Sequence, residues 1–431
     1  MNADRHEAPG LSLLVDRPGE DPVLLQTGLA SLEHGVPIRP NTTFNTGSVA
    51  KQITAHLVLL AARDNLFHVN QKAADLLPRL KISDVTIADL VTHQSGIRDA
   101  ESLLSLTGFR DLDHYTADDL RTLAYRQHRR AVTEGHFLYS NTNYLLLAEI
   151  LESVHRTTLA HLARRHLFDP LGMNDTHFKA DPRHVIPKAA AAYQATPHGW
   201  QHAETPVTLP GPGTLWTTVG DLDRWLAHLH QEWQHEHRLP REDALSYQPS
   251  DHRPYLYGPG LYADARPGRT AVFHYGHEQG FSAATHLDAA GLRLVCLSNN
   301  ANIAADQVTA ALLRELREHP DRNQSDLLRR AAARQRTPKV AVGTRPPLGD
   351  HSPHIELGTF TCDQAPGTLR LTHYAGTLHL WRRGARDQLT QAGPRAYTGN
   401  GYTLTLNGDT EQADRFTLDL DRAPGLTYVR Q

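Results

Sequence analysis

The sequence predicts an α+β fold: strands from both ends of one long region join a single sheet, helices fill the middle, and a small antiparallel β-barrel follows. Three observations lead to this prediction. Strand-like apolar stretches lie within residues 8–47 and return within 270–318, whereas residues from about 60 to 240 have mostly helical spacing. From about residue 353 the chain changes to short alternating stretches separated by glycine-containing turns. This order fits a sheet with a helical insertion better than regularly alternating strand–helix units.

The N-terminal part of the sheet is predicted to be a hairpin. Apolar runs at residues 11–15 and 23–27 flank residues 17–20, whose Arg-Pro-Gly-Glu composition is typical of a turn. Two prolines within residues 36–44 favour an extended chain there, because proline disfavours helix at the residue before it. The hairpin and this extended segment lead directly to residue 48.

Helical patterning begins at Ser48 and continues for most of the next two hundred residues. One helix is predicted after Ser48, and another over residues 87–93 with Gly96 as its C-terminal stop. Residues 142–166 are predicted to form one long amphipathic helix. Thr218 followed by Asp221 resembles a capping box at the start of a further helix.

Strands are predicted again at residues 271–274, 281–287 and 292–297, and a helix follows them. The predicted domains are therefore 1–318, a linker over 319–352 with a short helical stretch, and a β-barrel over 353–431. The linker is rich in Arg, Pro and Asp.

Composition excludes several classes of partner. The 431 residues carry 44 basic and 47 acidic side chains, which gives a net charge of -3 and no expectation of nucleic-acid binding. Neither a membrane-spanning run nor a signal-peptide core is present, so we expect a cytoplasmic protein as written, or a periplasmic or secreted one if a leader has been removed. Cys296 and Cys362 fall in different predicted domains, and a disulfide between them is not expected.

Histidine is abundant, and four histidines gather at positions 228, 230, 235 and 237. Such a cluster suggests either a metal site or a solvated helix and loop. We favour the solvated helix, because the four residues lack a compact ligand spacing. The sequence therefore predicts no metal and no cofactor.

The strongest catalytic candidate is the pair Ser48 and Lys51. Residues three apart on a helix share one face, so the amine can reach the hydroxyl. A serine becomes a nucleophile when a neighbouring base takes its proton, and a buried neutral lysine can be that base. Lysine is scarce in this chain, and only Lys51 has a serine three residues before it. An ordinary helix start, with Thr46 or Ser48 as the cap, is the alternative.

Two further segments carry groups that a hydrolase needs. In Tyr139-Ser140-Asn141, the phenol offers a base or proton relay, and the amide offers a hold on a substrate carbonyl. His274-Tyr275-Gly276 lies on a predicted strand and is followed by His277. A strand edge beside the nucleophile supplies a backbone N–H to an oxyanion hole, and His274 adds a polar or cationic group toward a substrate carboxylate. A core tyrosine and an ordinary strand histidine are the alternatives.

The order Ser-x-x-Lys, Tyr-x-Asn, His-x-Gly resembles the serine β-lactamase and penicillin-binding-protein family. The branch it resembles includes class C β-lactamases, D,D-carboxypeptidases, D-aminopeptidases and related esterases. Three other stretches are also similar to this family, at residues 92–96, 171–176 and 213–222. The resemblance covers about residues 8–318. It implies an antiparallel sheet flanked by helices, a mostly helical lobe, and a site between them. The C-terminal barrel resembles lipocalin-like domains appended to some peptidases of the family.

The resemblance also implies roles. Ser48 would be acylated, Lys51 and Tyr139 would share the proton transfers, and Asn141 would orient substrate. His274, Tyr275, Gly276 and His277 would line the substrate pocket, with the N–H groups of Ser48 and His277 forming the oxyanion hole. Many members have Lys-Thr-Gly or Lys-Ser-Gly at the third motif, so the bulky Tyr275 argues against strong β-lactamase activity.

Three functions are therefore considered. The first is a serine hydrolase acting through an acyl-enzyme at Ser48 on D-amino-acid peptides, amides or esters. The second is a class C-like β-lactamase, and the third is a non-catalytic penicillin-binding or sensor protein. The expected partner is a small-molecule or peptide substrate, and the sequence makes no prediction of oligomeric state.

Overall fold

The computed structural model describes residues 7–108, 114–203, 207–236, 239–242, 244–267, 270–320, 322–333, 355–374, 376–382, 385–408 and 413–431. Within these ranges the chain forms two compact units. Unit 1 combines residues 1–69 with 147–341, and unit 2 combines residues 70–146 with 342–431.

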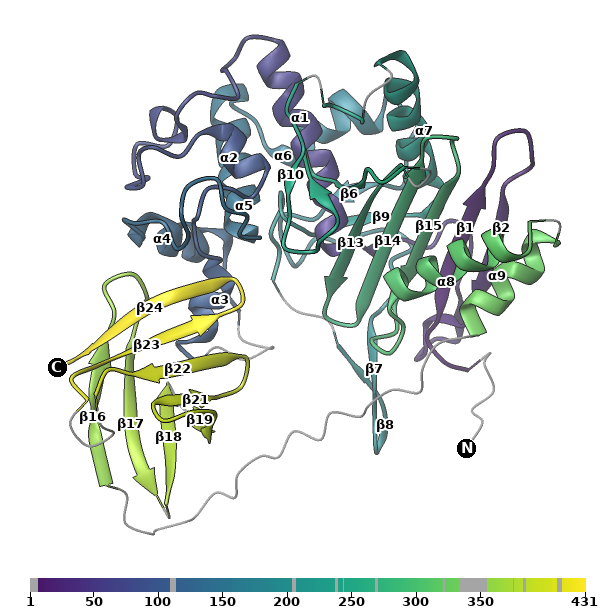
Figure 1. Cartoon of the computed structure of the whole chain (residues 1–431). Helices are drawn as coiled ribbons and strands as arrows, with labels where there is room; N and C mark the ends of the chain where they lie inside the picture. The colour runs from purple at the N-terminus through teal and green to yellow at the C-terminus, as the bar shows by residue number, and fades with distance from the viewer. Residues whose placement is uncertain are drawn as a thin grey trace. The chain divides into compact units, whose positions relative to one another are not determined.

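Unit 1 is built on an eight-stranded antiparallel sheet (Figure 1). The N-terminal hairpin joins the later strands because β1 pairs with β15, with Leu13 opposite Cys296. This confirms that both ends of the region contribute to one sheet. Its strands, in spatial order, are β10 (Gln248–Pro249), β11 (Leu256–Tyr257), β12 (Tyr262–Asp264), β13 (Ala271–Glu278), β14 (Phe281–Asp288), β15 (Arg293–Ser298), β1 (Leu11–Asp16) and β2 (Val23–Thr27).

Helices cover both faces of this sheet. On one face, α8 (Ala305–Glu318) and α9 (Gln324–Ala333) pack their apolar sides onto the strands (Figure 1). That core contains Leu13, Ala284 and the free thiol of Cys296, all buried. Successive strand residues point to opposite faces, so the α8 and α9 side buries Ala284 while Thr285 turns the other way.

The opposite face is covered by α1 (Lys51–Arg63) and α7 (Val219–Glu236). A buried polar chain ties these two helices to the sheet. Gln52 donates to Thr285 Oγ1 at 2.8 Å, and Trp225 Nε1 donates to Gln52 Oε1 at 3.0 Å. Because each of these buried polar atoms has a partner, the contact costs little desolvation energy and fixes the position of α1.

Shorter elements guide the chain into α1. The strand β5 (Phe44–Asn45) is held by β9 (Leu215–Thr217), which also pairs with β6 (His177–Phe178). A 3₁₀ turn over Gly47–Ala50 follows β5 and leads into α1. The remaining elements of unit 1 are β3 (Leu29–Ser31), β4 (Val36–Pro37), β7 (Tyr193–Thr196), β8 (Gly199–His202), α6 (Leu159–Ala163) and a π-helical turn over Arg164–Phe168.

Two helix boundaries differ from the sequence prediction. The helix expected over 142–166 is interrupted: α5 covers Asn141–His155, Arg156 adopts a left-handed φ of 53°, and α6 starts afresh with Thr158 as its cap. The helix at 87 also ends early. It is α2 (Ile87–Val91), and His93 takes the left-handed φ of 59° soon after it. Apolar residues recur at helical spacing on both sides of Arg156, so periodicity alone hid that break.

The cap at the start of α7 is only half of a capping box. The Asp221 N–H donates to Thr218 Oγ1 at 3.1 Å, as the sequence predicted. The Asp221 carboxylate instead accepts from Asp175 N at 2.9 Å and Thr176 Oγ1 at 2.8 Å. It therefore fastens the segment before β6 to the start of α7.

Unit 2 contains a nine-stranded antiparallel sheet that curls into a nearly closed barrel, as the alternating C-terminal sequence predicted (Figure 1). The two end strands of the sheet, β19 and β20, are separated by Leu389 alone, so they bring its edges toward each other. The strands, in spatial order, are β19 (Ala385–Gln388), β18 (Thr377–Arg382), β17 (Thr368–Tyr374), β16 (Ile355–Thr361), β24 (Ala423–Arg430), β23 (Arg415–Leu420), β22 (Tyr402–Leu406), β21 (Ala396–Thr398) and β20 (Thr390–Gln391).

The helical part of unit 2 comprises a 3₁₀ turn at Ala73–Asp75, α2, α3 (Ala100–Ser105), α4 (Ala117–Arg126) and the start of α5. Arg98 fastens this part to the barrel. Its guanidinium donates to the carbonyls of Pro424 at 2.7 Å and Gly425 at 3.3 Å, and to Gln364 Oε1 at 3.3 Å. Burial, followed by the charge of Arg129, lowers the pKa of Arg98 to about 10, so it remains a cation at neutral pH.

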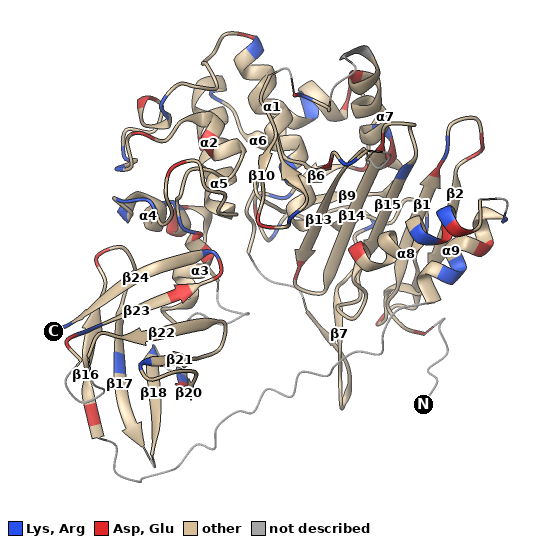
Figure 2. Cartoon of the chain, viewed as in Figure 1, with Lys and Arg blue, Asp and Glu red and all other residues tan. Residues whose placement is uncertain are grey.

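The charge distribution agrees with the near-zero net charge. Basic and acidic residues are interspersed along α4, α9 and the barrel strands, as Figure 2 shows. Among the described residues, no helix combines the length and apolarity needed to cross a membrane.

Replacing Arg98 with Met should destabilise unit 2. The substitution keeps much of the side-chain volume but leaves buried carbonyl groups without their donor, which costs about 1–3 kcal/mol for each group. We expect a loss of about 2–4 kcal/mol in the free energy of unfolding, measured by urea denaturation. Arg415→Met is the control. Arg415 begins β23, and its exposed ion pair with the preceding Asp414 contributes under about 1 kcal/mol to stability. Equal effects of the two variants would contradict the role given to Arg98.

Candidate active site

Ser48 and Lys51 lie together at the start of α1. Ser48 is half-buried in the 3₁₀ turn, and the side chain of Lys51 is fully buried. Lys51 Nζ lies 3.0 Å from Ser48 Oγ and 2.9 Å from the carbonyl oxygen of Pro212. Thr46 and Ser48 do not cap the helix with their side chains, which was the structural alternative. The amine is therefore in direct position to exchange a proton with the serine hydroxyl.

Two glycines allow β13 to touch the turn that carries Ser48. A Cβ atom on Gly276 would overlap the carbonyl oxygen of Thr46 and lie 3.0 Å from the Ser48 nitrogen. A Cβ on Gly47 would lie 2.8 Å from the carbonyl oxygen of His277, and Gly47 also adopts a left-handed φ of 49°. Only glycine allows this approach, because any side chain would push the two backbones apart.

The edge of β13 near the serine has no strand partner in the described ladder. β12 pairs with β13 only from Ala271 to Phe273, whereas β14 pairs along the whole strand as far as Glu278. From His274 onward, the second edge therefore faces the Ser48 turn. Such an edge can offer backbone N–H groups to a substrate, as strand addition does in peptide recognition.

His274 is neutral and enclosed. Its ring is buried, Nδ1 lies 2.7 Å from the carbonyl oxygen of Tyr275, and Nε2 lies 3.2 Å from the Tyr257 hydroxyl. Burial, followed by the positive charge of Lys51, lowers the pKa of His274 to about 3. Of the polar or cationic group expected at this position, the desolvated surroundings favour the polar, neutral form. A role for His274 toward a substrate carboxylate stays a prediction.

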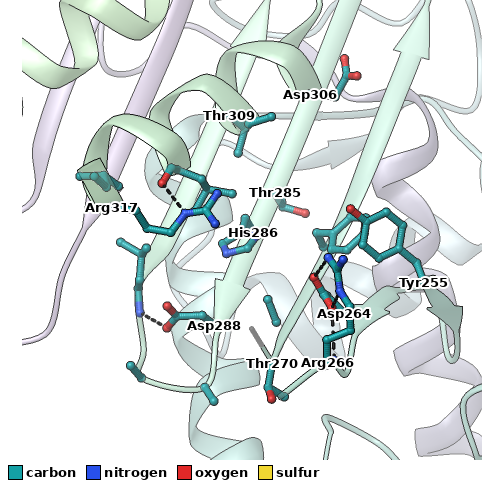
Figure 3. Close-up of a pocket in the computed structure, with 18 of the residues that line it drawn as sticks. Tyr255, Asp264, Arg266, Thr270, Thr285, His286, Asp288, Asp306, Thr309 and Arg317 are labelled. Atoms are coloured by element: carbon teal, nitrogen blue, oxygen red, sulfur yellow. Dashed lines mark hydrogen bonds and ion pairs between the residues drawn. The ribbon is translucent and has the colours of Figure 1, made fainter. Parts of the chain in front are cut away.

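Tyr275 and His277 lie on the other face of the strand, toward α8. Tyr275 packs against Phe273 with ring centroids 5.2 Å apart, and His277 Nε2 lies 3.8 Å from Asp306. Tyr275 lines a cavity of about 590 Å³ between the sheet and α8. Figure 3 shows the polar groups of this cavity, including His286 and the ion pair of Asp264 with Arg266. A substrate role for the Tyr275 side chain stays a prediction.

Unit 2 holds the Tyr139-Ser140-Asn141 segment, and His93 supports it. The His93 ring stacks on Tyr139 with centroids 4.3 Å apart, and its Nδ1 accepts from the Ser140 N–H at 3.2 Å. Asn143 Nδ2 lies 3.0 Å from the same nitrogen. His93 adopts a left-handed φ of 59°, and its ring contacts this segment. His93 belongs to the stretch 92–96 that is similar to the family.

Asn141 lies beside two carboxylates that the sequence analysis did not single out. Its backbone N–H donates to Asp99 Oδ2 at 2.7 Å, and its side-chain Nδ2 donates to Glu101 Oε2 at 2.7 Å. Tyr115 also donates to Glu101, at 2.6 Å. Asp99 is also the N-cap of α3. An aspartate just before a helix is most simply interpreted as a cap, so the sequence alone does not reveal its contact with Asn141.

Arg422, in the turn between β23 and β24, is the other residue that the sequence analysis missed. Its guanidinium carbon lies 4.8 Å from the centroid of the Tyr139 ring, and its carbonyl oxygen accepts from the Asp99 N–H at 2.9 Å. Although its surroundings desolvate it, Asp99 and Tyr139 raise the pKa of Arg422 above its ordinary value. No local pattern in the sequence connects a barrel turn to Tyr139.

Unit 1 thus brings together Ser48, Lys51, Gly276 and the His277 backbone, and Tyr139 and Asn141 belong to unit 2. Among the described residues, the one cluster of three possible metal ligands lies on α1 and α7 and does not include these residues. The arrangement in unit 1 suits nucleophilic attack by a serine with a lysine as its base.

Comparison with known proteins agrees with this arrangement. The family model described as Beta-lactamase matches residues 2–319. A D-aminopeptidase of Gluconobacter oxydans (strain 621H) is 26% identical over 321 residues, which cover 72% of this chain and 60% of that protein. A D-aminopeptidase of Brucella ovis is 25% identical and covers 64% of this chain and 53% of its own length. The chain therefore spans somewhat over half the length of these curated relatives.

Solved structures share the fold. A penicillin-binding protein homologue from Pyrococcus abyssi, described as octameric, aligns with a TM-score of 0.63 at 18% identity and covers 99% of this chain and 96% of its own. The penicillin-binding protein of Bacillus halodurans aligns with a TM-score of 0.60 at 20% identity, covering 73% of this chain and 99% of that one.

The contact between β13 and the Ser48 turn can be tested with Gly276→Ala. The new methyl group overlaps the Thr46 carbonyl, so the strand must move away from the turn, at a cost of about 1–3 kcal/mol. We expect labelling of Ser48 by a fluorophosphonate probe to slow at least about tenfold, which corresponds to an activation barrier about 1.4 kcal/mol higher. Gly220→Ala in α7 is the control, because its nearest neighbouring atom would be 3.8 Å away. If Gly276→Ala reacts as fast as the parent, the contact does not shape the site.

Proposed function

Because the chain belongs to the beta-lactamase family, we propose that it is a serine hydrolase that forms an acyl-enzyme at Ser48 on D-amino-acid peptides, amides or esters. The observation that carries this proposal is the 3.0 Å hydrogen bond between the buried Lys51 amine and the Ser48 hydroxyl. The family match supports the reaction class, and the D-aminopeptidase relatives support the choice of substrate.

In the acylation step, Ser48 Oγ attacks the substrate carbonyl carbon while Lys51, in its neutral form, accepts the hydroxyl proton. The carbonyl of Pro212 holds the amine in place at 2.9 Å, so the lysine need not reorganise during the transfer. The leaving amine or alcohol then takes this proton back from Lys51 as the bond to the carbonyl carbon breaks. Water next attacks the ester at Ser48, gives its proton to the neutral Lys51, and the proton returns to Ser48 Oγ as the product acid leaves. The neutral His274 beside this path does not compete for the proton near neutral pH.

The N–H groups of Ser48 and His277 form the proposed oxyanion hole. The close approach at Gly47 and Gly276 supports this assignment, since it places the two backbones in contact. Backbone donors of this kind stabilise the negative charge that develops on the carbonyl oxygen in the transition state. Each such donor is worth about 2.7–4 kcal/mol when removed from a hydrolase.

Tyr139 shares the proton transfers with Lys51, and Asn141 orients the substrate, as the family resemblance implies. The phenol is a suitable relay because the Arg422 guanidinium over its ring stabilises a developing phenolate. The Asn141 amide is pre-oriented by Glu101, which accepts its Nδ2 proton at 2.7 Å. A fixed amide loses little conformational entropy when substrate binds.

The charges around these groups favour a substrate with a free amine over one with a carboxylate. Asp99 and Glu101 both contact Asn141, and Arg422 offsets only one of these two negative charges, so that side of the segment keeps a negative potential that suits an ammonium group. A β-lactamase, by contrast, must hold the carboxylate of a penicillin or cephalosporin, and a neutral His274 supplies no charge for it. The β-lactamase alternative therefore ranks second.

Substituting Ser48 with Ala tests the nucleophile. Turnover of a D-amino-acid anilide should fall by about 10³–10⁶-fold, because loss of the nucleophile leaves only binding and oxyanion stabilisation. Mass spectrometry of the parent should also detect a covalent adduct with a fluorophosphonate, and the variant should lack it. Ser31→Ala is the control, since Ser31 is a partly buried serine whose hydroxyl bonds to Glu33 and the His34 N–H and which is not one of the proposed site residues.

The same assays, extended to a penicillin, separate the three candidate functions. Retained activity in Ser48→Ala would disprove the acyl-enzyme assignment. Fast release of a penicilloyl group from the parent would favour a β-lactamase, whereas a stable penicilloyl adduct with D-anilide turnover would favour the hydrolase proposed. No adduct with any of these reagents would favour a binding or sensor protein.

Replacing Arg422 with Ala tests the relay through Tyr139. Without the nearby cation the phenolate loses stabilisation, so the acidic limb of the kcat/KM profile should move to higher pH by about half a unit or more. Arg422→Lys keeps the charge and should recover most of the shift. Arg370→Ala removes a similar stacked arginine, 5.0 Å from the Trp381 ring, and should leave the profile unchanged. A raised KM with an unaltered profile would contradict the role given to Arg422.

A further inference from the structure

Three side chains with metal-ligating chemistry converge outside the proposed active site. His56 projects from α1, and His228 and Glu232 project from α7, one turn apart. One donor atom from each residue lies within 4.8 Å of the other two. The four clustered histidines at positions 228, 230, 235 and 237 include only one of these ligands, because Glu232 is not a histidine and His56 comes from another helix. Of these four, the side chain of His235 and all of His237 lie outside the described residues.

The spacing of the donor atoms fits an ion better than hydrogen bonds. Glu232 Oε1 lies 3.8 Å from His56 Nδ1 and 3.5 Å from His228 Nε2. Hydrogen bonds between such atoms require about 2.7–3.2 Å, so these pairs are too far apart. Ligands of a tetrahedral zinc ion, with bonds of about 2.0–2.1 Å, lie about 3.3 Å from one another. The two Glu232 pairs are within about 0.5 Å of that distance, and a bound ion would draw the three donors, all within 4.8 Å of one another, closer together.

The surroundings suit an ion that enters from solvent. His56 is buried, whereas the side chains of His228 and Glu232 are 28% and 30% exposed. The His56 ring packs edge-on against Trp225, with centroids 5.3 Å apart, and this contact fixes its orientation. One side of the cluster is therefore apolar and rigid, and the other is open for a water ligand.

The positive charge of Arg241 is the main electrostatic obstacle to a bound metal ion at this cluster. The position of its guanidinium nevertheless leaves room for the ion. Arg241 Nε lies 4.0 Å from Glu232 Oε2, the buried oxygen that makes no hydrogen bond, whereas the two histidines lie near Oε1. Its Nη1 is held by the carbonyls of Gln52 at 3.1 Å and Pro259 at 2.8 Å. A cation on the outer oxygen orients a ligating carboxylate, as outer partners do in metal sites. It also repels a divalent ion, so we expect micromolar affinity.

We propose that His56, His228 and Glu232 form a binding site for one divalent transition-metal ion. Two imidazoles and one carboxylate are the donor set that zinc accepts readily, with water as the fourth ligand. The ion would join α1 to α7 five residues after Lys51, so its effect would be to fix the helix that carries Lys51. The proposal is independent of the chemistry at Ser48.

The test is a cobalt and zinc titration of the full chain after dialysis against a chelator. We expect one Co²⁺ per chain, with visible absorption bands of a low-coordinate nitrogen and oxygen site, and stoichiometric displacement by Zn²⁺. Saturating Zn²⁺ should also raise the melting temperature, because an ion that binds only the folded state stabilises it by mass action.

Variants assign the binding to these residues. His228→Gln and Glu232→Gln, both at half-exposed positions of α7, should each weaken Co²⁺ binding at least about tenfold. His230→Gln is the matched control on the same helix, because His230 is not part of the cluster and its Nε2 lies 3.4 Å from Gln234. Circular dichroism establishes that each variant is folded.

Two results would overturn the proposal. One is the absence of saturable Co²⁺ binding by the parent up to about 0.1 mM ion, well above the expected dissociation constant. The other is binding that His228→Gln and Glu232→Gln leave unchanged, since the ion would then occupy other histidines of this histidine-rich chain.

Discussion

The approach of one backbone to another at Gly47 and Gly276 is the constraint on which the unit 1 part of the site depends. Neither glycine has room for a methyl group, and the atoms that a methyl would meet are backbone atoms of Thr46, Ser48 and His277. Backbone atoms cannot move aside as a flexible side chain does, so the contact is rigid. The sheet, the β5–β9 pairing and the polar chain through Gln52 all fix the two partners of this contact.

Within that rigid frame, burial sets the charges. Lys51 and His274 are both enclosed, and a desolvated site disfavours a positive charge on either group. Burial, followed by the charge that Lys51 carries when protonated, lowers the pKa of His274 to about 3, so Lys51 is the group that exchanges a proton with Ser48. A lysine at the His274 position, as many family members have, would put a second amine in this place. The histidine therefore changes the electrostatics of the pocket and not only its shape.

The sequence was sufficient where the physical cause is local. The strands at 11–16, 23–27 and 293–298 follow from alternation and turn composition, and the barrel follows from repeated short strands. The Ser48–Lys51 pair follows from helical spacing. Periodicity was insufficient at Arg156, where the backbone turns left-handed inside apolar patterning, and it did not fix the end of α2, after which His93 turns left-handed. Sequence periodicity also does not predict the contact of Arg422 with Tyr139 or that of His56 with His228. The residues of each pair are far apart in the sequence and meet only after the chain has folded.

The composition of unit 2 changes how the C-terminal barrel is understood. The Tyr139-Ser140-Asn141 segment is held by His93, Asp99 and Glu101 from the helical part, and the turn that carries Arg422 is bonded to Asp99 as well. Arg98 secures the next residues of the same barrel hairpin through the Pro424 and Gly425 carbonyls. From residue 334 onward the linker expected over 319–352 lies outside the described residues, and the barrel itself contacts the helical part of its own unit. It belongs to the compact unit that positions Tyr139, so a change in the barrel would reach that phenol through contacts already formed in the folded unit.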